Sequence, residues 1–181
     1  AVNSCATKTG QLDALATPAV LQAMSARGRS GPSAMEIALE EAAAAAGQGE
    51  VPVGAVIIEG ATSAIIARAG NRMRALNDPT AHAEMLVIRA AAARLQTERL
   101  DGCDLFVTLE PCTMCAAAIA FARVRRLFFG AYDPKGGGVE HGARFFAQPT
   151  CHYRPEVIGG VEEQRSQALL QAFFRARRPL P

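Results

Sequence analysis

The sequence contains no hydrophobic run long enough to cross a membrane. A membrane-spanning helix needs roughly 20 consecutive apolar residues, and every apolar stretch here is interrupted by Arg, Asn or Gly within about ten. We therefore expect no membrane partner for this protein.

We expect no secretory signal, and the chain carries no large excess of charge of either sign. Its five cysteines are an odd number, so a disulfide framework is not expected, and thiol or metal chemistry in a reducing compartment is favoured. The formal net charge of +2 is too small to indicate nucleic-acid binding by itself. Four arginines follow Glu163 without any acidic residue, however, so positive charge is concentrated near the C-terminal end.

Composition divides the chain into two regions. Residues 1–34 are rich in Ser, Thr, Gly and Ala and contain one acidic residue, Asp13, so we expect a disordered N-terminal extension with at most a short helix over 18–26. The scarcity of acids also resembles an organelle transit peptide, which is the alternative to a cytoplasmic location. Residues 35–181 are predicted to form one domain, since the chain is 50% hydrophobic and can bury a sizeable core.

The hydrophobic pattern of this domain alternates between helical and strand periodicity. Helices are predicted over 36–46, 80–94, 112–123 and 164–178, and strands over 51–59, 64–69, 105–109, 126–131 and 156–158. The hydroxyl of Thr80 is expected to cap the second helix. This order predicts an α/β fold, a three-layer α/β/α sandwich with a mixed central sheet of about five strands.

Three short pieces of sequence combine into a candidate metal site. They are His82-Ala83-Glu84, Pro111-Cys112 and Cys115, which together read H-x-E and P-C-x-x-C. Cys112 and Cys115 lie three residues apart at a helix start, which places both sulfurs on one face. With one imidazole they supply three ligands, the number that a catalytic zinc ion takes from protein while leaving its fourth position to water. Glu84 is not needed as a ligand and can transfer protons.

Two other interpretations of the same residues remain open. A closed structural zinc site would need a fourth protein ligand, for which the chain offers His141, His152, Cys103 and Cys151. Alternatively, Cys112 and Cys115 form a metal-free redox pair. The spacing also raises a difficulty, because residues two apart lie about 200° apart around a helix. His82 and Glu84 can share a pocket only if that pocket straddles the helix end.

H-x-E with P-C-x-x-C is the signature of zinc-dependent nucleobase deaminases, the tRNA adenosine deaminases among them. Further residues extend the similarity, and the chain resembles the bacterial-type tRNA-specific adenosine deaminase family over roughly residues 35–178. The matching segments are Val51-Pro-Val-Gly-Ala55, Asn71, Asp78-Pro-Thr-Ala-His-Ala-Glu84, Thr108-Leu-Glu-Pro-Cys-Thr-Met-Cys115, Gly130-Ala131 and Phe173-Phe-Arg-Ala-Arg-Arg178.

The resemblance implies a cytidine deaminase-like fold and a zinc-dependent conversion of adenosine to inosine at the wobble position of a tRNA anticodon, with an arginine tRNA as the expected substrate. It implies one zinc ion per chain held by His82, Cys112 and Cys115, Glu84 as the proton shuttle, and a homodimer. By the same match, the residues expected to contact the nucleotide or its neighbours in the anticodon stem-loop are Asn71, Pro52, Val53, Leu109, Ala131, Asp133 and Lys135. Further RNA contacts are expected from Arg175, Arg177 and Arg178, on a helix whose other side Leu170, Phe173 and Phe174 would bury.

The chain departs from the family after Asp133-Pro-Lys135. The family usually carries a loop of small residues ending in Ser there, whereas this chain has Gly136-Gly-Gly-Val-Glu-His141. This difference leaves the preference for flanking nucleotides open. The main alternative function is deamination of a free base or nucleoside such as guanine or cytosine, which would not need the arginines of the last helix.

Overall fold

The computed structural model describes residues 33–177, so three predictions lie outside it: the N-terminal extension, a helix over 18–26, and the placement of Arg178. The elements are α2 (Ala34–Gly47), β1 (Gly54–Glu59), β2 (Ile65–Gly70), α3 (Met73–Leu76), α4 (Ala83–Leu95), β3 (Cys103–Leu109), α5 (Thr113–Phe121), β4 (Arg126–Ala131), the 3-10 helix η1 (Phe145–Ala147), β5 (Glu156–Ile158) and α6 (Glu163–Arg175). All helices and strands predicted within residues 33–177 are present; α3 and η1 were not predicted.

The strands form one mixed five-stranded sheet in the order β2-β1-β3-β4-β5. Strand β1 pairs antiparallel with both β2 and β3, whereas β3 and β4, and β4 and β5, are parallel. The two parallel steps bring the C-terminal ends of β3 and β4 side by side, with Leu109 opposite Ala131. The residues that follow these two strands therefore meet at one edge of the sheet.

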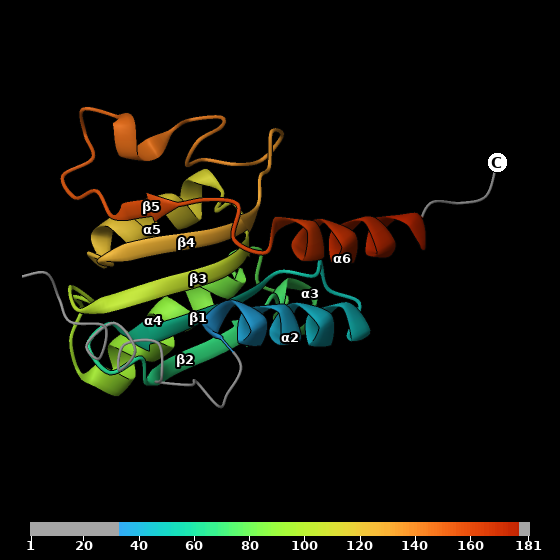
Figure 1. The fold of residues 1–181 in the computed structure, drawn as a ribbon, viewed down its shortest axis with the longest axis horizontal. Helices are drawn as coiled ribbons and strands as arrows, with labels where there is room; N and C mark the ends of the chain where they lie inside the picture. The colour runs from blue at the N-terminus through green and yellow to red at the C-terminus, as the bar shows by residue number, and fades with distance from the viewer. Residues whose placement is uncertain (1–32, 178–181) are drawn as a thin grey trace, which may run out of the picture. The chain divides into compact units, whose positions relative to one another are not determined.

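Helices cover both faces of this sheet. In Figure 1, α2 lies in front of the strands, α4 and α5 lie behind them, and α6 extends to the right of β4. Leu169 of α6 packs against the same core cluster as α2. Alternate residues of β1 serve the two layers: Val56 and Ile58 pack with α2, while Ala55 and Ile57 join the larger core with α4 and α5. Burial on both faces explains why β1 is a continuous apolar run, and the predicted three-layer sandwich is confirmed.

The start of α4 differs from the expectation, and the start of α2 has a cap that was not predicted. Helix α2 begins with a capping box, in which Ser33 Oγ accepts from the Glu36 N–H and Glu36 Oε2 accepts from the Ser33 N–H. The expectation that Thr80 caps α4 is wrong, because the N-cap of α4 is His82. The Thr80 hydroxyl instead donates to Asp78 Oδ1 at 2.7 Å, within a local turn in which the same oxygen also accepts the Thr80 N–H.

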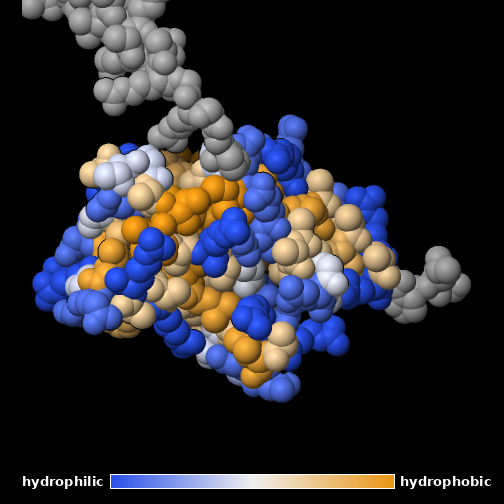
Figure 2. Space-filling view, turned by 90° about the horizontal axis from the view of Figure 1, so that it is seen from below, coloured by the Kyte–Doolittle hydropathy of each residue, from blue (hydrophilic) through white to orange (hydrophobic). Residues whose placement is uncertain are grey.

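The described residues also bear on the membrane and disulfide expectations. No helix within 33–177 is long and apolar enough to cross a bilayer. The side of the molecule that presents β2 shows hydrophobic surface interrupted by charged side chains (Figure 2).

The cysteines of this part of the chain are all free thiols, as the odd cysteine count predicted. They are Cys103, Cys112, Cys115 and Cys151.

Candidate active site

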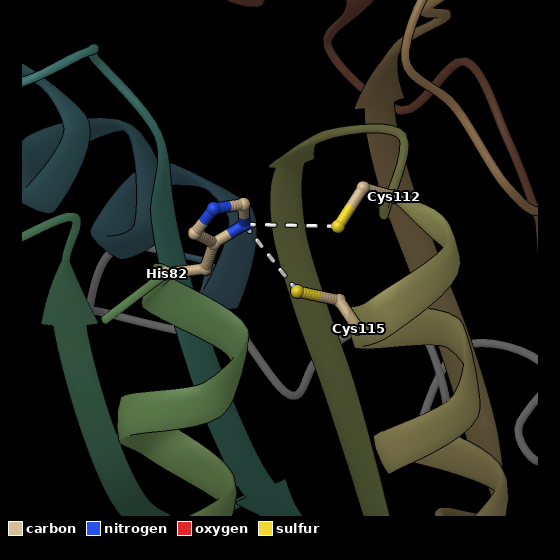
Figure 3. A group of neighbouring side chains, drawn as sticks. All are labelled: His82, Cys112 and Cys115. Atoms are coloured by element: carbon tan, nitrogen blue, oxygen red, sulfur yellow. Dashed lines mark hydrogen bonds between the residues drawn. The ribbon is translucent and has the colours of Figure 1, made fainter. Parts of the chain in front are cut away.

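The predicted metal-binding side chains meet between the starts of two helices. His82 is the N-cap of α4 and Cys112 is the N-cap of α5, while Cys115 lies in the first turn of α5. The Nδ1 atom of His82 lies 3.7 Å from Cys112 Sγ and 3.5 Å from Cys115 Sγ, and the three side chains point toward one another (Figure 3). The three ligand atoms all lie within 4.8 Å of one another.

These separations fit a zinc ion. A tetrahedral zinc ion with Zn–S near 2.3 Å and Zn–N near 2.05 Å places its nitrogen and sulfur ligands about 3.6 Å apart. Both nitrogen–sulfur distances agree with that value within about 0.1 Å. The donor set of one imidazole and two thiols is also the type that zinc prefers, and the geometry identifies Nδ1 of His82 as the nitrogen that could bind it.

The protonation of the two cysteines differs in the metal-free chain. The S–H of Cys115 donates to Cys112, and this bond together with His82 lowers the pKa of Cys112 to about 4, against the opposing effect of burial. The same bond and burial raise the pKa of Cys115. The pKa of His82 is raised, first by its interaction with Cys112. A metal ion that binds both sulfurs would therefore displace the proton of Cys115.

Glu84 lies in the first turn of α4, two residues after His82. Its side chain is buried (3% exposed) and interacts with the thiol of Cys115. Burial raises the pKa of Glu84, although its own backbone N–H and the neighbouring His82 act in the opposite direction. The angular difficulty is resolved because His82 precedes the helical turn as an extended N-cap residue (φ −69°, ψ 151°), so helical spacing does not separate the two side chains.

Asn71 is connected directly to the start of α4. Its side-chain Oδ1 accepts the Ala83 N–H at 2.8 Å, and its own backbone N–H donates to the Val53 carbonyl at 2.9 Å. Asn71 therefore satisfies one of the open backbone donors at the helix start from a distant part of the sequence. Because the oxygen accepts this bond, the amide nitrogen is the side-chain atom of Asn71 that can donate to another group.

Comparison with known proteins identifies the family. Residues 30–131 match the family described as cytidine and deoxycytidylate deaminase zinc-binding region. A tRNA-specific adenosine deaminase of Agrobacterium fabrum is 60% identical over 144 residues, covering 80% of this chain and 93% of that protein. The enzyme of the same description from Rickettsia felis is 43% identical, covering 78% of this chain and 98% of that protein.

One solved structure, from a study of A-to-I editing by tRNA:A34 deaminases at the wobble position of transfer RNA, is 60% identical to this chain. It superimposes with a TM-score of 0.74 over 76% of this chain and 98% of that chain. This chain belongs to the tRNA-specific adenosine deaminase family.

In this tRNA-specific adenosine deaminase family member, several further predicted residues line a cavity of about 1050 Å³. Leu109 at the end of β3, and Asp133 and Lys135 after β4, form part of its wall, and Arg175 and Arg177 contribute from the end of α6. Five of the predicted nucleotide- or RNA-contacting residues are thus brought together, although they come from three separate segments. The guanidinium of Arg177 lies 3.5 Å from the ring centroid of Phe173.

Other predicted contact residues lie deeper. Pro52 is buried, and Val53 (5% exposed) and Ala131 (1% exposed) belong to the core. On α6, Phe173 is buried as expected, but Phe174 is 50% exposed and lines the cavity rather than packing beneath the helix. Burial of Phe174 was therefore a wrong prediction, because two adjacent residues of a helix point about 100° apart.

The closed structural zinc site is contradicted within the described residues. No fourth His, Cys, Asp or Glu ligand joins His82, Cys112 and Cys115 there. His141 instead contacts Glu110 at 2.7 Å, and the Cys151 thiol donates to the Tyr153 carbonyl at 3.1 Å. The group thus offers three candidate protein ligands, which is the number typical of catalytic zinc.

Two buried glutamates of this family member were not singled out from the sequence. Glu50 Oε1 accepts the N–H groups of Arg74 and Ala75, at the start of α3. Glu110 accepts N–H groups from residues on both sides of the loop 133–141. Sequence spacing gives no sign of these roles, because the partners are backbone groups far along the chain; only the position of Glu110 directly before the P-C-x-x-C segment was a hint.

Proposed function

We propose that this protein hydrolyses adenosine to inosine at the wobble position of a tRNA anticodon, with one zinc ion per chain held by His82, Cys112 and Cys115. The observation that carries this proposal is the distance of His82 Nδ1 from both sulfurs, which matches a tetrahedral zinc site, with the buried carboxyl of Glu84 beside the Cys115 thiol. The 60% identity to a tRNA-specific adenosine deaminase over 80% of the chain supports tRNA as the substrate class.

The reaction replaces the C6 amino group of adenine by oxygen from water and releases ammonia. Zinc, when bound, supplies the Lewis acidity that makes water reactive near neutral pH. Glu84 takes a proton from water and delivers it to N1 of the base while the water oxygen bonds to C6. Glu84 then carries the remaining hydroxyl proton to the amino group, so that the C6–N bond breaks and ammonia leaves. The raised pKa of Glu84 suits a group that must both accept and return a proton.

The other residues bind and orient the nucleotide. A base must leave its stack to reach the site, which costs a few kcal/mol and less in a loop than in a duplex. The Asn71 amide is placed to donate to the extruded nucleoside beside the start of α4. Lys135, Arg175 and Arg177 place positive charge on one cavity, where they can contact the phosphates of neighbouring nucleotides.

The test is to incubate the purified protein with an anticodon stem-loop that carries wobble adenosine. Inosine should form with ammonia release, and metal analysis should give one zinc ion per chain. Cys112→Ser should lose both the zinc and the activity, because two remaining ligands leave the positive charge of zinc uncompensated. Deamination of guanine or cytosine in place of the stem-loop would favour the free-base alternative, and thiol cycling without zinc would favour the redox one.

We also propose a homodimer, as the family resemblance implies, and a cytoplasmic location, as tRNA modification suggests. Phe121, at the end of α5, is 79% exposed and is the most exposed large apolar side chain in residues 33–177. A partner chain could cover it, since exposed aromatic surface favours association. Light scattering should give twice the mass of one chain, and Phe121→Ser should shift the protein toward monomer if this surface takes part.

A further inference from the structure

The loop 133–141 is held by a single carboxylate. Glu110 is 2% exposed and lies in the turn between β3 and α5. Its Oε2 accepts the Asp133 N–H at 3.0 Å, at the beginning of the loop. Its Oε1 accepts the N–H groups of Val139, Glu140 and His141 at 3.2, 2.8 and 2.9 Å, at the end of the loop. One side chain therefore fixes both ends of this segment.

The same segment is tied to the turn that presents Cys112. The Gly138 N–H donates to the Pro111 carbonyl at 2.8 Å, and Gly137 pairs with Cys112 in an isolated bridge. A Cβ atom on Gly137 would lie 2.5 Å from Glu110 Cδ, so only glycine permits this approach. Gly137 is therefore required by the carboxylate beneath it.

The outer part of the loop forms a wall of the large cavity. Asp133, Lys135 and Gly136 line that cavity opposite residues of α6. Asp133 Oδ1 accepts the N–H groups of Lys135 and Gly136 at 3.1 and 3.0 Å, which makes the turn compact. A shift at either end of the loop would therefore move the Lys135 side chain relative to the nucleotides it is proposed to contact.

His141 adds a fifth interaction to the same carboxylate. Its Nδ1 lies 2.7 Å from Glu110 Oε2, and because an ionised carboxylate only accepts, the ring donates. The side chain is 35% exposed, so one face of the ring is available to solvent. The ring therefore reinforces the end of the loop through the same carboxylate that holds its backbone.

We propose that His141 is a positioning residue that, through Glu110, fixes the loop 133–141 and so determines how the cavity receives the nucleotides flanking the target adenosine. The inference rests on the proposed tRNA deaminase function. Within the described residues, His141 belongs neither to the metal-binding group nor to the cavity lining; its ring meets the lining only edge-on at Tyr132, with the ring centroids 6.1 Å apart. Its removal should therefore change substrate binding and selectivity while leaving the chemical step intact.

Steady-state kinetics on anticodon stem-loops tests this inference. His141→Ala should raise KM roughly tenfold, since a hydrogen bond to a charged group is lost, with kcat within about twofold of wild type. Its relative rates on stem-loops with altered flanking nucleotides should also converge. His141→Asn should restore much of the wild-type behaviour, because its amide nitrogen is bonded to Cγ as Nδ1 is in histidine. Glu140→Ala is the matched control, since that adjacent side chain is exposed.

Amide hydrogen exchange provides a readout that is independent of activity. Exchange at residues 139–141 should accelerate in His141→Ala and return toward wild type in His141→Asn, with zinc content unchanged. An active wild type whose KM and selectivity are the same in His141→Ala overturns the inference alone, as does a loss confined to kcat. A wild-type chain that produces no inosine overturns the proposed function, and the role in tRNA recognition with it.

Discussion

Two buried glutamates beside the metal-binding group have opposite electrostatic surroundings. Glu84, at the start of α4, is 3% exposed, and burial raises its pKa. Glu110, before α5, is 2% exposed, and burial acts in the same direction, but the N–H groups of Asp133 and His141 outweigh it and lower its pKa. Donors rather than depth decide the difference, and they separate a carboxyl suited to proton transfer from one that holds structure.

The largest effect is expected from Glu84→Gln, which removes the proton-transfer group and keeps its shape. Turnover should fall about 10²- to 10⁴-fold, because no other carboxyl of the motif can replace it. Inosine formation and zinc content should be measured together, and zinc should stay bound. Glu98→Gln, at a side chain that is 85% exposed, is the control. If Glu84→Gln keeps activity within threefold of wild type, Glu84 is not the proton-transfer group, and this functional difference from Glu110 does not exist.

Glu110→Gln should act on stability instead. An amide offers one acceptor oxygen and turns its NH2 toward backbone N–H groups, so the free energy of unfolding should fall by about 2–4 kcal/mol. Urea denaturation of the metal-loaded protein measures this loss, with Glu140→Gln as the neighbouring control. A change below about 0.5 kcal/mol would contradict the structural role assigned to the Glu110 carboxylate.

Asp104 sharpens the comparison, because it is a buried carboxylate at the opposite end of β3. Burial acts to raise its pKa, but Arg125 and Arg126, at 2.8 and 2.6 Å, outweigh burial and lower it. Asp104→Asn should cost about 1–2 kcal/mol of stability at pH 7, since the arginines remain partly solvated. Because the pKa of Asp104 is lower in the folded chain than in the unfolded chain, its carboxylate stabilises the fold at a pH above the unfolded-state pKa. The cost of Asp104→Asn should therefore shrink as the pH falls below about 4. At pH 7 the substitution should leave the zinc content unchanged.

The smallest effect is expected from a substitution in the cavity wall, which should change only tRNA binding. Arg175→Gln should leave both glutamates untouched and weaken tRNA binding across sequences. Each lost phosphate contact should reduce the slope of log affinity against log salt by roughly 0.7 to 0.9. Arg165→Gln, near the start of the same helix and paired with Glu162, is the matched control. Equal slopes for the two variants would show that the end of α6 does not bind phosphate.

Much of the site could be predicted because its chemistry is local. H-x-E and P-C-x-x-C each occupy a few consecutive residues, and the spacing of Cys112 and Cys115 places two sulfurs together whatever the surrounding fold. The strands of the sheet could be predicted equally well, since strands buried on both faces appear in the sequence as long apolar runs. Helix starts were harder to predict. Thr80 has the side chain of a cap, yet its hydroxyl donates to Asp78, and Asn71 accepts the N–H group at the start of the helix instead.

The sequence by itself determined the order of helices and strands, the metal-binding residue types and the family. Only the tertiary structure decided that His82 is an extended N-cap beside the two sulfurs, that Glu84 is buried, and that Glu110 holds the loop 133–141. The physical reason is that secondary structure and ligand chemistry depend on side chains close in sequence, which patterns record. Burial and backbone hydrogen bonding depend on what packs nearby from distant segments, and a carboxylate has the same letter whether its pKa rises or falls.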